Sequence, residues 1–145
     1  MKKLFFAALV TIFIGASSFS ASANDEIRSV QAFNASYNTN NSVDWKYTNN
    51  FHKASTIING AKSDYFYTPE GEFLASSKSY DFDKLPAQGL KTLTTSYAYP
   101  AYTLEECIVI ENADQEVNYY VSLVKANKKT ILQITTDGTV SAIGK

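Results

Sequence analysis

Two stretches of the chain place apolar residues at helical spacing. The first extends over about residues 25–37 and presents Ile27, Val30, Phe33 and Tyr37. The second follows Leu85-Pro86 and presents Leu90, Leu93 and Tyr97. Because residues three and four positions apart lie on one side of a helix, this pattern predicts two amphipathic helices.

The segments after each predicted helix are short runs rich in aromatic and β-branched residues, separated by turn signals, which is typical of strands. Eight strands are predicted, at about 43–48, 51–58, 63–68, 73–81, 103–111, 117–126, 130–136 and 139–143. Asn59-Gly60 is the strongest turn signal, because both central positions of a two-residue type I′ hairpin favour φ above zero. Asp137-Gly138 predicts another tight hairpin.

The predicted order of elements is therefore a helix followed by four strands, and this order occurs twice. Apolar residues of the first predicted helix recur sixty positions later in the second, and Thr68-Pro69-Glu70-Gly71 parallels Thr135-Thr136-Asp137-Gly138. We expect an α+β fold of two tandem repeats, each a helix plus a four-stranded antiparallel sheet, over about 24–83 and 84–145. Neither half buries both faces of a sheet alone, so the halves should join into one sheet or two abutting sheets.

The N-terminus has the pattern of an export signal. Lys2 and Lys3 precede an uncharged apolar run from Leu4 to Ala16, and Ala21-Ser22-Ala23 supplies small residues for cleavage after Ala23. The apolar run is shorter than the roughly 20 residues that a spanning helix needs. We expect residues 1–23 to be removed, and residues 24–145 to form a single periplasmic or secreted domain without a membrane span.

Charge and cysteine content narrow the function classes. The chain has 13 basic and 14 acidic residues, and losing Lys2 and Lys3 makes the mature chain more acidic. Such a balance argues against nucleic acid as a partner, because tracking a phosphate backbone needs many Lys and Arg side chains. Cys107 is the only cysteine, so no internal disulfide can form. Its neighbours Ile108 to Ile110 predict a buried, unreactive thiol.

Few residues suggest catalysis. His52 is the only histidine, so it has no second histidine with which to complete a zinc site, and it is interpreted as a strand or surface residue. Two acidic pairs, Asp81/Asp83 and Glu105/Glu106, flank predicted element boundaries, where solvated charge is routine. We expect no metal site, no cofactor and no enzymatic activity.

Tyrosine is the residue type most suited to recognition. Tyr65 and Tyr67 lie on one face of the third predicted strand and Phe66 on the other, so only one set can meet the helix. We expect the open face to expose Tyr65 and Tyr67, with Tyr47 nearby on the first strand. Tyr99 and Tyr102 surround Pro100 and form a second candidate contact. The alternative for each ring is that it fills the core.

The chain resembles the PepSY-like family named for its likeness to β-lactamase-inhibitor proteins. The matching residues, which extend over most of 25–145, are Val43-Asp44-Trp45, Lys53-Ala54, Pro69-Glu70-Gly71-Glu72, Leu74-Ala75-Ser76, Leu85-Pro86, Tyr102 and Tyr119-Tyr120-Val121. The resemblance implies helix-plus-sheet repeats with a curved sheet surface, and a role in binding proteins. The namesake inhibitors carry disulfides that this chain cannot form, so the resemblance does not identify β-lactamase as a target.

These observations predict an exported, non-enzymatic binding module that engages another extracytoplasmic protein through the open face of its sheet. The alternative is a sensor or scavenger that binds a small ligand, such as a peptide, glycan or cation, between the two halves. A shallow aromatic surface would favour the first function and an enclosed pocket with converging polar groups would favour the second.

Overall fold

The computed structural model describes residues 23–37 and 39–143. The predicted export signal and its cleavage site lie almost wholly outside these residues. None of the helices in the described part of the chain is long and apolar enough to cross a membrane. The element boundaries agree with the predicted ones to within a few residues, because the helices follow from the spacing of apolar residues and the strands from local composition and turn signals.

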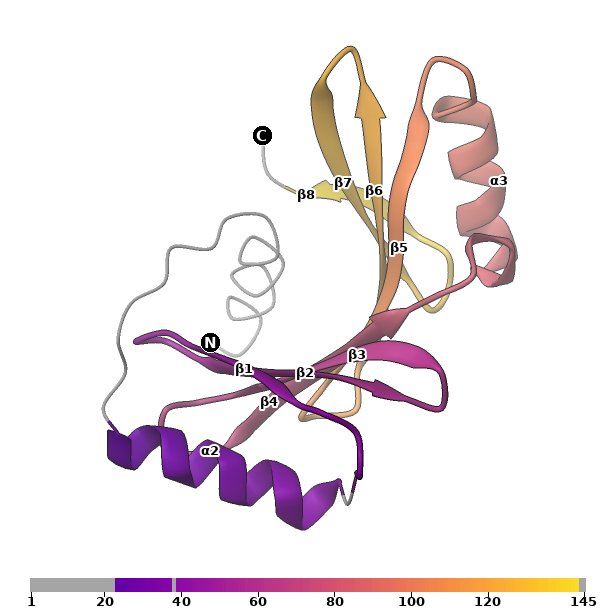
Figure 1. The fold of residues 1–145 in the computed structure, drawn as a ribbon. Helices are drawn as coiled ribbons and strands as arrows, with labels where there is room; N and C mark the ends of the chain where they lie inside the picture. The colour runs from indigo at the N-terminus through magenta and orange to yellow at the C-terminus, as the bar shows by residue number, and fades with distance from the viewer. Residues whose placement is uncertain (1–22, 38, 144–145) are drawn as a thin grey trace.

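Within residues 23–37 and 39–143, the fold consists of two helices, a short 3-10 helix and eight strands (Figure 1). In chain order they are α2 (Ala23–Ser36), β1 (Asp44–Tyr47), β2 (His52–Ile58), β3 (Ala61–Tyr67), β4 (Phe73–Ser79), η1 (Phe82–Lys84), α3 (Ala87–Ser96), β5 (Thr103–Asn112), β6 (Val117–Lys125), β7 (Lys128–Thr135) and β8 (Val140–Ile143). One helix followed by four strands therefore occurs twice.

All eight strands belong to one antiparallel sheet, in the order β1 to β8. The strand pair β4–β5 joins the two halves, with Ala75 opposite Asn112 and Ser79 opposite Ile108. Of the two arrangements left open by the sequence, the single continuous sheet is the one that forms. It is strongly curved, and both helices lie on its outer, convex side (Figure 1).

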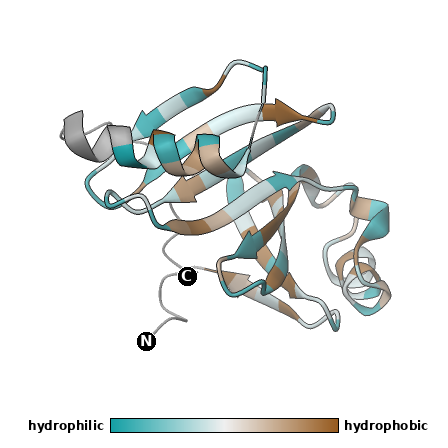
Figure 2. Cartoon of the chain, turned by 90° about the horizontal axis from the view of Figure 1, so that it is seen from below, coloured by the Kyte–Doolittle hydropathy of each residue, from teal (hydrophilic) through white to brown (hydrophobic). Residues whose placement is uncertain are grey.

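Each helix covers its own half of the convex face. Phe33 of α2 packs with three strand residues: Ala54, Tyr65 and Tyr67. Leu93 of α3 packs with a separate cluster that includes Val121, Leu123, Leu132 and Ile134. Figure 2 shows hydrophobic and hydrophilic residues alternating along the strands, as expected for a sheet whose two faces differ.

The tight turns agree only in part with the dipeptides that predicted them. Asn59 and Gly60 have φ of 52° and 79°, as a type I′ hairpin requires. At Asp137-Gly138 only the glycine has positive φ, and the strands are four residues apart, so the predicted tight hairpin is a wider loop. A two-residue turn with positive φ at both positions also occurs between β6 and β7, where Ala126 and Asn127 have φ of 48° and 62°.

Candidate functional site

Tyr65 and Tyr67 lie on the helix-covered face of β3, so the expectation that they are exposed is wrong. Their exposed fractions are 8% and 1%, and both pack with Phe33 of α2. Because side chains alternate along a strand, Phe66 points to the opposite face, where it is also buried. Alternation predicted rings on both faces but did not determine which face α2 covers.

Tyr47 is half-buried at the edge of the same core. Its ring stacks on Trp45, with centroids 5.7 Å apart and planes 3° apart, and it meets the edge of the His52 ring at 4.9 Å. Both Trp45 and Tyr47 are on the convex side, because they pair with Ala54 and His52 of β2. Tyr47 therefore contributes to the margin of the α2 core.

Tyr99 and Tyr102 lie near the other end of the molecule, in the connection between α3 and β5. Tyr99 is 83% exposed, whereas Tyr102 is half-buried against Tyr97, with ring centroids 5.2 Å apart. The Lys125 Nζ lies 4.8 Å from the centre of the Tyr102 ring. The five predicted contact residues are thus spread over separate places, and their role in partner binding stays a prediction.

His52 is buried in β2 and joins α2 to the sheet. Its Nδ1 lies 2.7 Å from the Ser29 Oγ, and the Ser29 hydroxyl also lies 3.2 Å from the carbonyl oxygen of Thr68. These contacts tie the helix to β2 and to the turn after β3. A buried hydrogen-bonded histidine suits that structural role.

One member of each acidic pair forms an ion pair with a lysine. The Asp81 carboxylate lies 2.8 Å from the Lys84 Nζ, and the Glu105 carboxylate lies 2.5 Å from the Lys129 Nζ. Among the described residues, no group of three or more His, Cys, Asp or Glu side chains is placed to hold a metal ion. The absence of enzymatic activity and of a cofactor remains an expectation from the sequence.

Cys107 is buried in β5, as the sequence predicts. Burial, reinforced by the charges of Asp81 and Glu106, raises the pKa of the Cys107 thiol from 9.0 to about 11. We therefore expect iodoacetamide at pH 8 to modify native Cys107 about a hundredfold more slowly than the urea-unfolded chain, as followed by mass spectrometry. Comparable rates in the two states would contradict the buried position.

The same shift predicts how stability depends on pH. The folded-state pKa lies above the ordinary value, so forming the thiolate favours unfolding. The contribution of Cys107 is intact below about pH 9 and is lost as pH rises through about 11. Burial also raises the pKa of Tyr120 to about 12, which extends the loss of stability to higher pH.

The sheet face opposite the helices carries a continuous apolar cluster. Its buried members are Phe51, Phe66, Ala75, Ile108, Ile110 and Tyr120, and the partly buried Leu74, Ile131 and Ile143 pack against them. We call these nine residues the helix-free cluster, because all of them come from strands or strand ends, and neither α2 nor α3 contributes to it. Ile57, on the same face of β2, is 57% exposed.

Polar pairs are interspersed with this cluster. The Lys53 Nζ lies 3.7 Å from the Asp64 carboxylate, and the Gln133 side-chain amide donates to the Asn118 side-chain oxygen at 3.1 Å. Strand register places all four residues on the helix-free face, because Lys53 pairs with Phe66 and Gln133 pairs with Tyr120. This face therefore combines an apolar centre with fixed polar groups.

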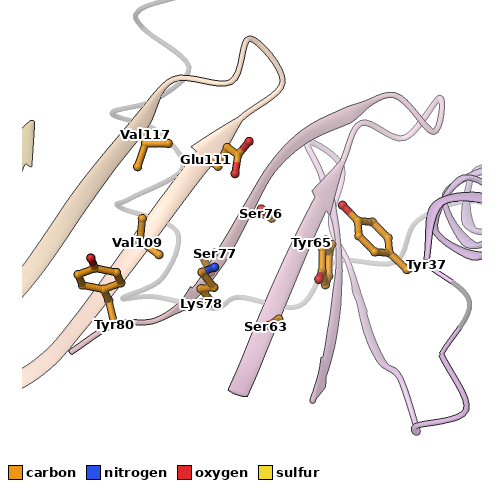
Figure 3. Close-up of a pocket in the computed structure, with 10 residues that line it drawn as sticks. All are labelled: Tyr37, Ser63, Tyr65, Ser76, Ser77, Lys78, Tyr80, Val109, Glu111 and Val117. Carbon is orange, nitrogen blue, oxygen red and sulfur yellow. The ribbon is translucent and has the colours of Figure 1, made fainter. Parts of the chain in front are cut away.

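A second candidate site is a cleft of about 280 Å³ on the convex side, between the parts of the sheet that α2 and α3 cover (Figure 3). Tyr37 and Tyr65 face each other on one side of the cleft, and Tyr80 lies on the other. Lys78 of β4 and Glu111 of β5 lie between them. We call this the inter-half cleft.

Sequence reasoning did not identify the polar residues of the inter-half cleft. Lys78 and Glu111 are 33 positions apart, and each reads as an ordinary solvated strand residue. Only the β4–β5 pairing brings them to adjacent strands on one face. β4 and β5 are separated in the chain by α3. The sequence contains no local pattern that specifies how two such distant strands pair, so it could not predict that these two residues are neighbours.

Neither a protein-family model nor a curated protein matches the sequence. Solved structures from Bacteroides share the fold, including the following three. A DUF2874 family protein from B. uniformis has a TM-score of 0.68 at 16% identity, covering 83% of this chain and 86% of its own. A protein from B. eggerthii to which a periplasmic location is attributed has a TM-score of 0.67 at 17% identity, covering 86% and 91%.

The third is a BLIP-like protein from B. fragilis, with a TM-score of 0.65 at 14% identity, covering 89% of this chain and 91% of its own. The predicted likeness to β-lactamase-inhibitor proteins is therefore confirmed at the level of the fold, whereas the likeness to PepSY proteins stays a prediction. The described part of the chain, a single eight-stranded antiparallel sheet with two helices, accordingly has the same fold as these DUF2874 and BLIP-like proteins.

Proposed function

We propose that this chain is an exported, non-enzymatic binding module that engages another extracytoplasmic protein through the helix-free face of its sheet. The observation that carries the proposal is the helix-free cluster, which lies opposite both helices. Its partly exposed members Leu74, Ile131 and Ile143, together with the exposed Ile57, offer apolar surface to a partner. Burying such surface contributes roughly 25 cal/mol per Å².

The arrangement suits recognition for two physical reasons. Eight hydrogen-bonded strands hold the surface in one shape, so little conformational entropy is lost on binding. The Lys53–Asp64 and Gln133–Asn118 pairs add polar groups that can fix the orientation of a partner. Protein interfaces combine apolar area with direct hydrogen bonds, and this face supplies groups for both.

The comparisons support an extracytoplasmic role. One structure of the same fold is attributed to the periplasm, and another is named for its likeness to β-lactamase-inhibitor proteins. The predicted leader at residues 1–23 agrees with export. Membership of the PepSY-like family is part of this proposal, and β-lactamase is not assigned as the target.

We also propose that the two halves arose by duplication. The turns that precede β4 and β8 use the same hydrogen bonds: the Gly71 N–H donates to the Thr68 carbonyl oxygen at 2.9 Å, and the Gly138 N–H donates to that of Thr135 at 2.9 Å. Both glycines have positive φ and lie against the helix of their own half. This correspondence supports the parallel that the sequence predicts between these two turns.

The proposal predicts that the double variant Ile57→Asp/Ile143→Asp loses its partner. Two charges on the helix-free face would have to be desolvated in the complex, so we expect capture of the partner to fall at least about tenfold. The measurement is capture of cross-linked partners from periplasmic and secreted fractions on the immobilised chain, quantified by mass spectrometry.

The matched control is Gln31→Asp/Thr94→Asp, which places the same two charges at exposed positions on α2 and α3. It should retain the partner, and circular dichroism should show that both double variants fold. A folded Ile57→Asp/Ile143→Asp chain that keeps every partner would refute binding through this face. Loss of the partner in Tyr99→Ala instead would place the contact in the α3–β5 connection.

A further inference from the structure

The inter-half cleft is built by strand register rather than by a loop. Across β3, β4, β5 and β6 the convex face presents two adjacent rows of side chains. One row is Ser63, Lys78, Val109 and Tyr119, and the next is Tyr65, Ser76, Glu111 and Val117. Since neighbouring strands are about 4.8 Å apart, these rows form a continuous patterned floor.

Aromatic rings border this floor at both ends. The Tyr37 and Tyr65 rings have centroids 4.2 Å apart, and the Tyr80 and Tyr119 rings have centroids 4.8 Å apart. Tyr65 is buried, whereas Tyr37 and Tyr80 are only partly buried and line the cleft from opposite sides (Figure 3). A flat or apolar group placed in the cleft could contact a tyrosine ring on either side.

Opposite charges lie between the aromatic borders. Ser76 pairs with Glu111 and Lys78 pairs with Val109, so Lys78 and Glu111 are diagonal neighbours on adjacent strands. Both are exposed, and neither forms an ion pair within the part of the chain that the structure describes. Glu111 also acts on Tyr37: burial raises the pKa of the Tyr37 hydroxyl, and the Glu111 carboxylate raises it further.

We propose that the inter-half cleft binds a small zwitterionic ligand of the amino-acid or short-peptide class. Glu111 receives the ligand's ammonium group, Lys78 receives its carboxylate, and the bordering tyrosines contact an aromatic or apolar side chain. A volume of about 280 Å³ is near the lower limit of ligand pockets, which suits a small ligand. The site is on the opposite side of the sheet from the proposed protein-binding face.

The experiment titrates the chain with the dipeptide Gly-Phe and follows backbone amide resonances by NMR. We expect shifts at Ser76, Lys78 and Glu111, and affinity at least about tenfold lower for the N-acetylated and the C-amidated dipeptides, because each lacks one charge-assisted contact. Glu111→Gln should weaken binding of Gly-Phe but leave that of N-acetyl-Gly-Phe unchanged. Lys78→Met should likewise leave binding of the C-amidated dipeptide unchanged.

Glu70→Gln and Lys91→Met are the matched controls, because they neutralise exposed charges away from the cleft, and both should bind Gly-Phe normally. Three outcomes would overturn the proposal. One is no binding of Gly-Phe up to about 10 mM, a concentration that detects even weak ligands. The second is equal affinity for the blocked dipeptides. The third is that cellobiose, a neutral disaccharide, shifts the same resonances while Gly-Phe does not, which would identify a glycan site.

Discussion

Replacing Phe33 with alanine should lower the free energy of unfolding by about 3–5 kcal/mol, the range observed for truncating a fully buried phenylalanine. The Phe33 side chain has no exposed surface. Its ring meets Trp45 edge-on at 5.7 Å and Tyr65 at 5.4 Å, and it lies 5.3 Å from Tyr37. Among the described residues, Phe33 is also the one buried apolar residue of α2 in the cluster that joins this helix to the sheet.

Urea denaturation followed by tryptophan fluorescence measures this effect, because Trp45 contacts the ring that is removed. Gln31→Ala is the control, since Gln31 is exposed on the same helix and its loss should change stability by less than about 0.5 kcal/mol. A cost below about 1 kcal/mol for Phe33→Ala would mean that packing of α2 contributes little to the stability of the sheet.

The second large effect is expected for Gly138→Ala, at about 3 kcal/mol. Gly138 has φ of +88°, a conformation that costs a residue with a Cβ roughly 1–2 kcal/mol. An added Cβ would also lie 2.8 Å from the Gln88 Cβ and 2.9 Å from the backbone nitrogen of Gly89. Relieving these contacts requires α3 to move away from the β7–β8 turn, which adds the cost of overpacking, about 1–3 kcal/mol.

Gly60→Ala separates the cost of the backbone conformation from the cost of the close contacts with α3. Gly60 has φ of +79°, but an added Cβ would meet nothing within 4 Å, so only the backbone cost applies. We expect Gly60→Ala to destabilise by about 1 kcal/mol and Gly138→Ala by clearly more, both measured by urea denaturation. Equal costs at the two positions would show that the contact between α3 and the β7–β8 turn is not tight.

Local patterns in the sequence predicted the secondary structure well. The apolar spacing around Phe33 and Leu93 located both described helices, and runs of aromatic and β-branched residues bounded by turn signals located the eight strands. Asn59-Gly60 also predicted its own turn type. Each of these features depends on the conformational preference of a few consecutive residues, which is why the sequence alone reveals them.

The residues of the candidate sites were harder to predict. The sequence selected Tyr65 and Tyr67 for an exposed face, whereas they pack under α2 and the helix-free cluster occupies the other side. The Ala126-Asn127 turn was missed because alanine rarely adopts positive φ. These errors arise where the outcome depends on what packs against a residue.

The sequence by itself determined where helices, strands and several turns begin and end, because those depend on spacing along the chain. Only the tertiary structure decided that the halves share one sheet, that α2 and α3 cover the same face, and that Lys78 lies diagonally from Glu111. These outcomes depend on pairing between distant strands and on the free energy of burying one face of the sheet rather than the other. Because β3 carries rings on both faces, its sequence does not determine which face the helix covers, and packing decides it.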